Sequence, residues 1–178
     1  MGADVITTGN HCFKRRDSIG IYDDDNIIRP INFPDGCPGK GYCLIDCGCF
    51  SAAVVNLMGT VYMEPLDNPF TVMENLLDSL KTPNIFVDFH AEATAEKKAM
   101  GHFLAGRVTA VLGTHTHVQT ADEIILKDHT GYITDAGMTG PELSVLGVSI
   151  EAAVDKQRFK YPVRFTEAQT ACFINGVV

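Results

Sequence analysis

The stretch Ile85-Phe86-Val87-Asp88-Phe89-His90 is a short apolar run that ends beside a carboxylate and in an imidazole. Two other runs end in similar chemistry: Val5-Ile6-Thr7-Thr8-Gly9-Asn10-His11 before it and Ala110-Val111-Leu112-Gly113-Thr114-His115-Thr116-His117 after it. Such β-branched and aromatic runs are typical of buried strands. In open α/β sheets, sites form where the carboxyl ends of strands meet, so these polar ends are predicted to converge in one crevice.

The remaining pattern predicts a mixed α/β fold. Asn68 is expected to cap a helix in which Pro69 is the first residue, and Pro83 to stop it. Thr94 is expected to cap a second helix that Gly106 closes. The predicted strands are Asp4–Thr8, Gly41–Asp46, Ala52–Met58, Asn84–Phe89, Val108–Gly113, Tyr132–Thr134 and Pro162–Ile174. Proline and glycine predict loops at Arg29–Gly41, expected beside the site, and at Gly137–Gly147.

Composition limits the class of protein. The 178 residues, 46% hydrophobic and 20% charged, fit one domain spanning 1–178. Neither a bilayer-spanning stretch nor a signal core is evident, so a cytoplasmic location is expected. A net charge of −8 argues against duplex nucleic acid as a partner, yet it permits a small phosphate ester held by metal. The six cysteines lack a disulfide framework, so reduced thiols are expected.

The histidines are the main chemical signal. In extended chain His115 and His117 would point to the same face, and each would carry a desolvation penalty unless paired or liganded. Alone, His90 fits a hydrogen-bonded core or rim histidine, and Gly9-Asn10-His11 fits an ordinary turn. Together the segments favour metal, because imidazole suits Zn and Fe and an asparagine oxygen suits Mn or Fe.

At these residues the chain resembles calcineurin-like metallophosphoesterases, whose later signature blocks are Gly-Asn-His, an isolated His and Gly-His-x-His. More closely, it resembles their bacterial YmdB-type branch. The resemblance covers nearly the whole chain and includes the blocks at 2–11, 29–34, 38–41, 88–94, 113–122, 133–141 and 162–165. It implies a sandwich of two mixed β-sheets flanked by helices, two divalent metal ions (Fe or Mn, with Zn as another option), and hydrolysis of 2′,3′-cyclic nucleotides or related phosphodiesters.

The resemblance also implies roles for individual residues. Carried over by motif, Asn10, His90 and His115 correspond to ligands of one metal, His117 to a ligand of the other, and His11 to the catalytic histidine. Asp135 and Asp88 are candidates for accepting hydrogen bonds from the metal-binding imidazoles and so fixing their tautomers. A purely structural hydrogen-bonding role for the two aspartates is an equally good alternative. Two cations would lower the pKa of a bridging water, neutralise the phosphoryl oxygens and orient the hydroxide for in-line attack.

The family pattern also includes Gly-Asp and Gly-Glu-Asn blocks that supply acidic metal ligands, and both precede the point where this chain starts. The chain is therefore expected to be incomplete at its N-terminus, and to be short at its C-terminus as well. Neutral ligands alone would leave two dications repelling each other, so weak or single-metal binding with little activity is expected. Missing strands would also leave an edge prone to association, hence a possible homo-oligomer.

Two alternatives remain open. One is an inactive, metal-poor remnant or ligand-binding module. The other is a zinc hydrolase acting on amide or ester bonds, since three histidines can hold one catalytic zinc. An asparagine ligand and the Gly-Asn-His block favour phosphoryl chemistry over the zinc hydrolase.

Overall fold

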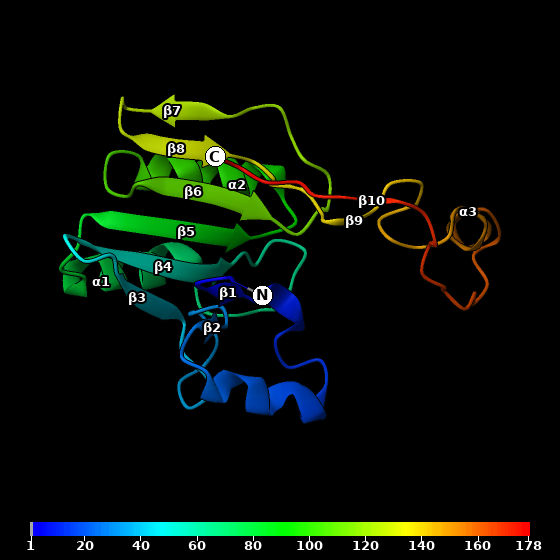
Figure 1. Cartoon of the computed structure of the whole chain (residues 1–178), viewed down its shortest axis with the longest axis horizontal. Coiled ribbons are helices and arrows are strands. Elements are labelled where there is room, and N and C mark those ends of the chain that lie inside the picture. Colours follow the sequence, from blue (N-terminus) through cyan, green and yellow to red (C-terminus); the bar gives the residue numbers. More distant parts are fainter. Residues whose placement is uncertain (1) are drawn as a thin grey trace.

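A six-stranded mixed sheet forms the centre of the computed structural model, which describes residues 2–178 (Figure 1). The strand order is β3-β4-β5-β6-β8-β7; the four inner strands are parallel, and the two edge strands pair antiparallel with their neighbours. The strands are β3 (Tyr42–Asp46), β4 (Ser51–Met58), β5 (Asn84–His90), β6 (Ala110–Thr114), β7 (Ile124–Leu126) and β8 (Thr130–Ile133). The predicted mixed α/β class is confirmed.

Two crossover helices connect the inner strands: α1 (Pro69–Ser79) follows β4, and α2 (Thr94–Leu104) follows β5. The Asn68 side chain accepts hydrogen bonds from the backbone N–H groups of the first turn of α1, so the predicted cap is confirmed. The predicted cap of α2 is wrong, because Thr94 is its first helical residue and the N-cap, Ala93, makes no side-chain bond. Gly106, at φ +83°, lies just beyond the end of α2, as expected for a left-handed terminator.

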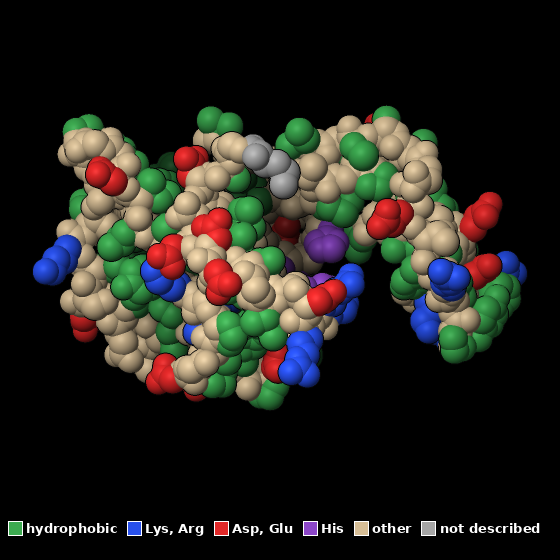
Figure 2. All heavy atoms as spheres, turned by 60° about the horizontal axis from the view of Figure 1, so that its bottom comes forward, with side chains coloured by type: hydrophobic (Ala, Val, Ile, Leu, Met, Phe, Trp, Pro, Cys, Tyr) green, Lys and Arg blue, Asp and Glu red, His purple; other side chains and the backbone are tan. Residues whose placement is uncertain are grey.

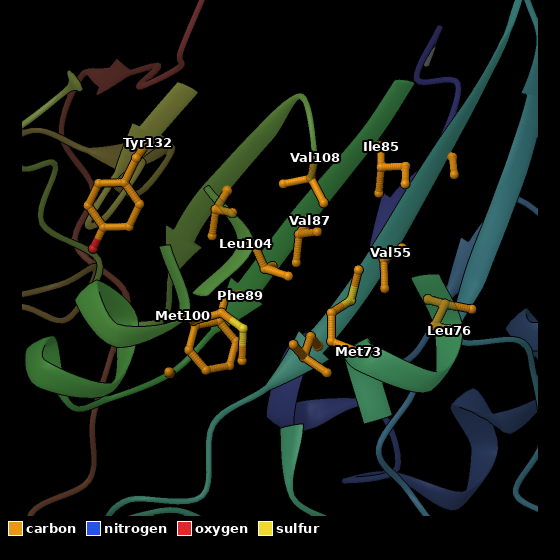
Figure 3. Packing of buried hydrophobic residues seen from close by; sticks show 14 residues of the cluster. Val55, Met73, Leu76, Ile85, Val87, Phe89, Met100, Leu104, Val108 and Tyr132 are labelled. Atoms are coloured by element: carbon orange, nitrogen blue, oxygen red, sulfur yellow. The ribbon is translucent and has the colours of Figure 1, made fainter. Parts of the chain in front are cut away.

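Both helices cover the same face of the sheet. Met73 of α1 and Met100 of α2 pack against Val55, Val87 and Phe89, and all five side chains are fully buried (Figure 3). Because side chains alternate along a strand, the opposite face of β5 carries Phe86, Asp88 and His90. His90 therefore ends β5 on the face turned away from the helices.

That opposite face has no large covering element among residues 2–178. Two of its apolar side chains are partly solvent-exposed, namely Phe86 (37%) and Ile125 (63%). Besides the central sheet, the described chain forms only two-stranded ladders. These are β1 (Ile6–Thr7) with β2 (Ile27–Ile28), and β9 (Gly140–Pro141) with β10 (Cys172–Phe173). A second large sheet, as in the expected sandwich, is not formed by the described residues.

The largest departures from the sequence prediction lie near the C-terminus. The strand predicted over Pro162–Ile174 is wrong except at β10, and the predicted loop Gly137–Gly147 contains β9. An unpredicted helix, α3 (Ile150–Phe159), lies in a lobe beside the sheet (Figure 1). Near the N-terminus, two 3-10 helices follow β1, namely η1 (Gly9–His11) and η2 (Arg16–Asp23). All six cysteines are free, and no helix within residues 2–178 is long and apolar enough to cross a membrane.

Substitution of Gly113 tests how closely β6 approaches the chain that follows β8. A Cβ at this position would collide with the carbonyl oxygen of Thr134. We expect Gly113→Ala to lower the free energy of unfolding by about 3 kcal/mol, because the colliding group is backbone and cannot rotate away. The measurement is urea unfolding followed by circular dichroism.

Gly131→Ala in the neighbouring strand is the matched control. Its Cβ would lie 3.7 Å from Ala110 Cβ, an ordinary contact, so the change should stay within about 1 kcal/mol. Equal destabilisation by both substitutions would contradict the close approach at Gly113.

Candidate functional site

The site lies where the parallel strands end. β5 ends at His90, which is in register with Thr114 at the end of β6. His115 follows directly, and Asp135 comes two residues beyond the end of β8. η1 brings Asn10 to the same edge. The convergence predicted for the ends of these runs is therefore observed for Asn10, His90 and His115.

Three side-chain atoms that could bind a metal meet at the centre of this site. His90 Nε2 lies 2.9 Å from Asn10 Oδ1 and 3.1 Å from His115 Nδ1. Gly9 makes this possible: it has φ +63°, and a Cβ there would lie 2.6 Å from the His90 ring. A glycine is thus required both by the backbone conformation and by the imidazole packed against it.

The hydrogen bonds behind the imidazoles fix their tautomers. Thr114 Oγ1 donates to Asp88 Oδ1 (2.6 Å), so it accepts from His90 Nδ1–H (2.9 Å). His115 Nε2 lies 3.1 Å from Glu92 Oε2, to which it donates. In neutral imidazoles the remaining nitrogens, His90 Nε2 and His115 Nδ1, then carry lone pairs that face each other.

This arrangement fits a cation. The lone pair of His90 Nε2 faces those of Asn10 Oδ1 at 2.9 Å and His115 Nδ1 at 3.1 Å, and such contacts are repulsive unless a positive charge lies between the atoms. Two ligand atoms about 2.1 Å from one ion and at right angles are about 3.0 Å apart. Within residues 2–178, no group of three or more His, Cys, Asp and Glu side chains is arranged to hold a metal. The set found here includes an asparagine oxygen and two imidazoles.

Burial keeps the imidazoles neutral. Burial, with the nearby charges of His115 and Lys97, lowers the pKa of His90 to about 3. Burial also lowers the pKa of His115, although the Glu92 carboxylate opposes this shift. Neutral imidazole is the form that binds metals, so both histidines are in the ligand-competent state.

Asp88 and Asn56 connect the site to the sheet. Burial raises the pKa of the Asp88 carboxyl, and hydrogen bonds from Thr114 and Thr7 oppose that shift. Asn56 Nδ2 donates to Asp88 Oδ2 (3.1 Å), while Asn56 Oδ1 accepts from Gly9 N–H (3.2 Å). One fully buried amide thereby ties the loop carrying Asn10 to the carboxylate behind His90.

A buried ion pair holds the loop after β6. Lys97 Nζ lies 2.7 Å from Asp135 Oδ2, and both side chains are 1% exposed. The same oxygen accepts from Thr116 N–H (3.0 Å) and Thr116 Oγ1 (2.8 Å). Burial alone would raise the pKa of Asp135, but hydrogen bonds from Lys97, Gly137 and Thr116 hold it below its ordinary value. His115 and His117, on either side of Thr116, have φ of 106° and 68°.

The positive φ angles correct one step of the sequence prediction. His115 and His117 were expected to face the same way in extended chain, but they lie in a sharp bend, where the alternation of a strand does not apply. His117 is exposed and lines a separate pocket of about 270 Å³ with Met138 and Phe173. Its charge nevertheless contributes to lowering the pKa of His115, so the two side chains are near each other.

His11 is also exposed, at the end of η1, and its charge contributes to the low pKa of His90. Figure 2 shows histidine side chains in a hollow between the main body and the lobe that carries α3. The structure therefore brings Asn10, His90 and His115 into contact, with His11 and His117 nearby and open to solvent.

Three supporting residues were missed by the sequence analysis. Asn56 interrupts the apolar run of β4, and Lys97 lies on the buried face of α2 with Met100 and Leu104. A polar residue within an apolar pattern was therefore the available signal. Glu92, which contacts His115, gave no signal as a tautomer-fixing residue, because its partner is 23 residues away.

Comparison with known proteins identifies relatives of this chain. The family model described as YmdB-like protein matches residues 1–178. A Bacillus subtilis protein named 2′,3′-cyclic-nucleotide 2′-phosphodiesterase is 47% identical over 99% of this chain and 68% of its own length. The chain therefore spans about two thirds of that relative.

Solved structures show the same relationship. A Thermus thermophilus protein of undescribed function superposes with a TM-score of 0.91 at 40% identity, over 96% of this chain and 68% of its own. A Mycoplasma pneumoniae structure described as a novel phosphatase gives 0.89 at 32% identity, over 96% and 64%. A Staphylococcus aureus structure described as a 5′-nucleotidase, at 17% identity, gives 0.58 over 76% and 32% and shares the fold alone.

Lys97→Met tests the buried ion pair. The substitution leaves the Asp135 carboxylate buried without its cation, which should lower the free energy of unfolding by about 3–5 kcal/mol. Lys98→Met is the control, because it removes a more exposed pair with Asp122 and a cation–π contact with Tyr132 and should change stability much less. Urea unfolding of both variants measures the difference, and similar losses would contradict the role given to Lys97.

The low pKa of His90 predicts an acid-sensitive fold. Between about 3 and the ordinary 6.5, the unfolded chain binds a proton at His90 that the folded chain does not, so the free energy of unfolding rises with pH. Metal-free protein should lose stability as the pH falls from 6.5 towards 4. His90→Gln should reduce that slope by on the order of 1 kcal/mol per pH unit. Urea unfolding with chelator present provides the test, and an unchanged slope would refute a buried neutral His90.

Proposed function

The chain belongs to the YmdB-like protein family, and from this premise we propose that it is a metal-dependent phosphodiesterase acting on 2′,3′-cyclic nucleotides or related phosphodiesters. The observation that carries the proposal is the contact of Asn10 Oδ1, His90 Nε2 and His115 Nδ1, whose lone pairs face each other. The name of the Bacillus subtilis relative supports the substrate class. A cytoplasmic setting is part of the proposal and rests on the sequence.

Asn10, His90 and His115 would hold one divalent ion, and His117 would contribute to a second. Fe or Mn suits the mixed nitrogen and oxygen donors, with Zn as the other candidate. When bound, such ions supply an acidified water as nucleophile and positive charge facing the phosphoryl oxygens. Asp88, through Thr114, holds His90 in the tautomer that presents Nε2, and Glu92 does the same for Nδ1 of His115.

His11 would act on the leaving group. Its exposed imidazole lies at the end of η1, directly after Asn10. A histidine there that is not bound to metal would donate a proton to the departing ribose oxygen or stabilise charge on phosphorus. Its place beside Asn10 and outside the central contact supports separate roles for the two neighbours.

The neutral donor set limits how many ions this chain would hold. Asn10, His90 and His115 bring no negative charge, and the nearby Glu92 is already hydrogen-bonded to His115. Two dications in such a site would repel each other by several kcal/mol. We therefore expect one ion held by Asn10, His90 and His115, a second held only weakly with the help of His117, and slow turnover. Further acidic donors would be required for a full two-metal centre.

The test combines metal analysis with turnover. The chain loaded with Mn²⁺ should hydrolyse adenosine 2′,3′-cyclic monophosphate, and His90→Ala and His117→Ala should lower metal content. His11→Ala should keep its metal and slow hydrolysis by about 10²-fold. The exposed His129→Ala, on the turn after β7, is the control and should match the wild type in both measurements.

Two outcomes would contradict the proposal. Equal metal loss in the His11 and His117 variants would contradict the division of roles between them. Wild-type chain that binds no metal and hydrolyses no phosphodiester would instead favour a non-enzymatic remnant.

A further inference from the structure

A pocket of about 540 Å³ has Asn10 of the candidate metal site in its lining. Its walls come from the residues that follow η1, from the loop between β2 and β3, and from the segment after β4. The residues used below are Asn10, Phe13, Lys14, Phe33, Pro34 and Glu64. Its size lies within the range of small-molecule sites, about 300–1,000 Å³.

Two aromatic rings form an apolar wall of the pocket. Phe13 and Phe33 meet edge to face, with centroids 5.4 Å apart and ring planes at 90°. Each is partly exposed, and Pro34 extends the apolar wall. A flat heteroaromatic group gains stacking energy on such faces in a way that an aliphatic group does not.

The aromatic wall is held rigidly. Tyr22 contacts Phe13 with a centroid distance of 5.5 Å. Its hydroxyl donates to Thr8 Oγ1 (2.9 Å) and lies 3.2 Å from the Cys12 carbonyl oxygen. Gly39, at φ +81°, lies so close to the Tyr22 ring that a Cβ would be 2.7 Å from it. A fixed wall reduces the entropy lost when a ligand binds.

The pocket adjoins the candidate metal site through Asn10. Asn10 lines it, and Asn10 Oδ1 lies 2.9 Å from His90 Nε2. Only two residues separate Asn10 from Phe13. A ligand whose phosphate lies against the Asn10–His90–His115 contact would therefore place its attached group in this pocket. Lys14 and Glu64 at the pocket supply a donor and an acceptor for its polar edge.

We propose that this pocket binds the nucleobase of the substrate, with Phe13 and Phe33 as the stacking residues. The inference rests on the proposed phosphodiesterase function and assigns to it a base-binding subsite. The pocket that includes His117 is smaller, about 270 Å³, and has a single aromatic residue, Phe173. The pocket lined by Asn10, Phe13 and Phe33 therefore suits a base better than the pocket that includes His117.

The experiment compares ligands with and without a base. Isothermal titration of the full chain uses adenosine 2′,3′-cyclic monophosphate and the 2′,3′-cyclic phosphate of methyl riboside. Wild-type chain should bind the nucleotide about tenfold more tightly. Phe13→Leu and Phe33→Leu, which keep an apolar side chain, should remove most of that preference and leave affinity for the base-free ligand unchanged. Phe159→Leu on α3 is the control, with a half-exposed ring stacked on Tyr161.

Equal affinities of the wild type for the two ligands, or equal losses for both ligands in the Phe13 and Phe33 variants, would overturn the subsite. If a variant does not fold, the wild-type ring-proton shifts of Phe13 and Phe33 decide, since only the nucleotide should move them. Hydrolysis of the base-free ligand separates the two proposals. A chain that hydrolyses neither this ligand nor the nucleotide counts against the phosphodiesterase, whereas turnover of both with no preference for a base counts against the pocket alone.

Discussion

The hydrogen-bond chain from Asp88 through Thr114 to His90 is the constraint on which the site depends. The threonine hydroxyl has one proton and gives it to the carboxylate, so the imidazole must donate its Nδ1 proton to the threonine oxygen. His90 Nε2 is then left as a lone pair at the point where Asn10 and His115 also present theirs. The geometry of two neighbouring parallel strands, in register at His90 and Thr114, is what makes this chain of bonds possible.

Sequence periodicity identified the elements that build this edge because their apolar alternation is strong. β4, β5 and both crossover helices bury Val55, Val87, Met73 and Met100 in one core, and each pattern spans several turns or residue pairs. The ends of two of the runs brought His90 and His115 together, since strand order in a parallel sheet brings carboxyl ends together. Asn10 reaches the same edge from η1, which follows the separate two-stranded ladder of β1 and β2. The chemical roles of these residues came from resemblance and remain proposals.

What the sequence did not predict depends on tertiary context. The bend at His115 and His117 follows from Asp135 binding Thr116, a contact across 19 residues that no local pattern records. The segment from Pro162 onward has β-rich composition but forms a strand only at Cys172 and Phe173, with one isolated bridge at Glu167, because strand propensity needs a partner edge to be realised. α3 carries a weaker apolar stripe with one buried residue, Ala153, so the periodicity of its sequence did not predict a helix.

The pair formed by Lys97 and Asp135 has a consequence for how this sequence can diversify. Neither residue contacts the proposed ligand atoms, yet Asp135 sets the backbone of Thr116 between two histidines with positive φ. A substitution at Lys97, Thr116 or Asp135 alone leaves a buried charge or hydrogen-bond donor without its partner. Positions 97, 116 and 135 are therefore expected to vary together, so a designer who wishes to re-aim the histidines would replace all three in a single step.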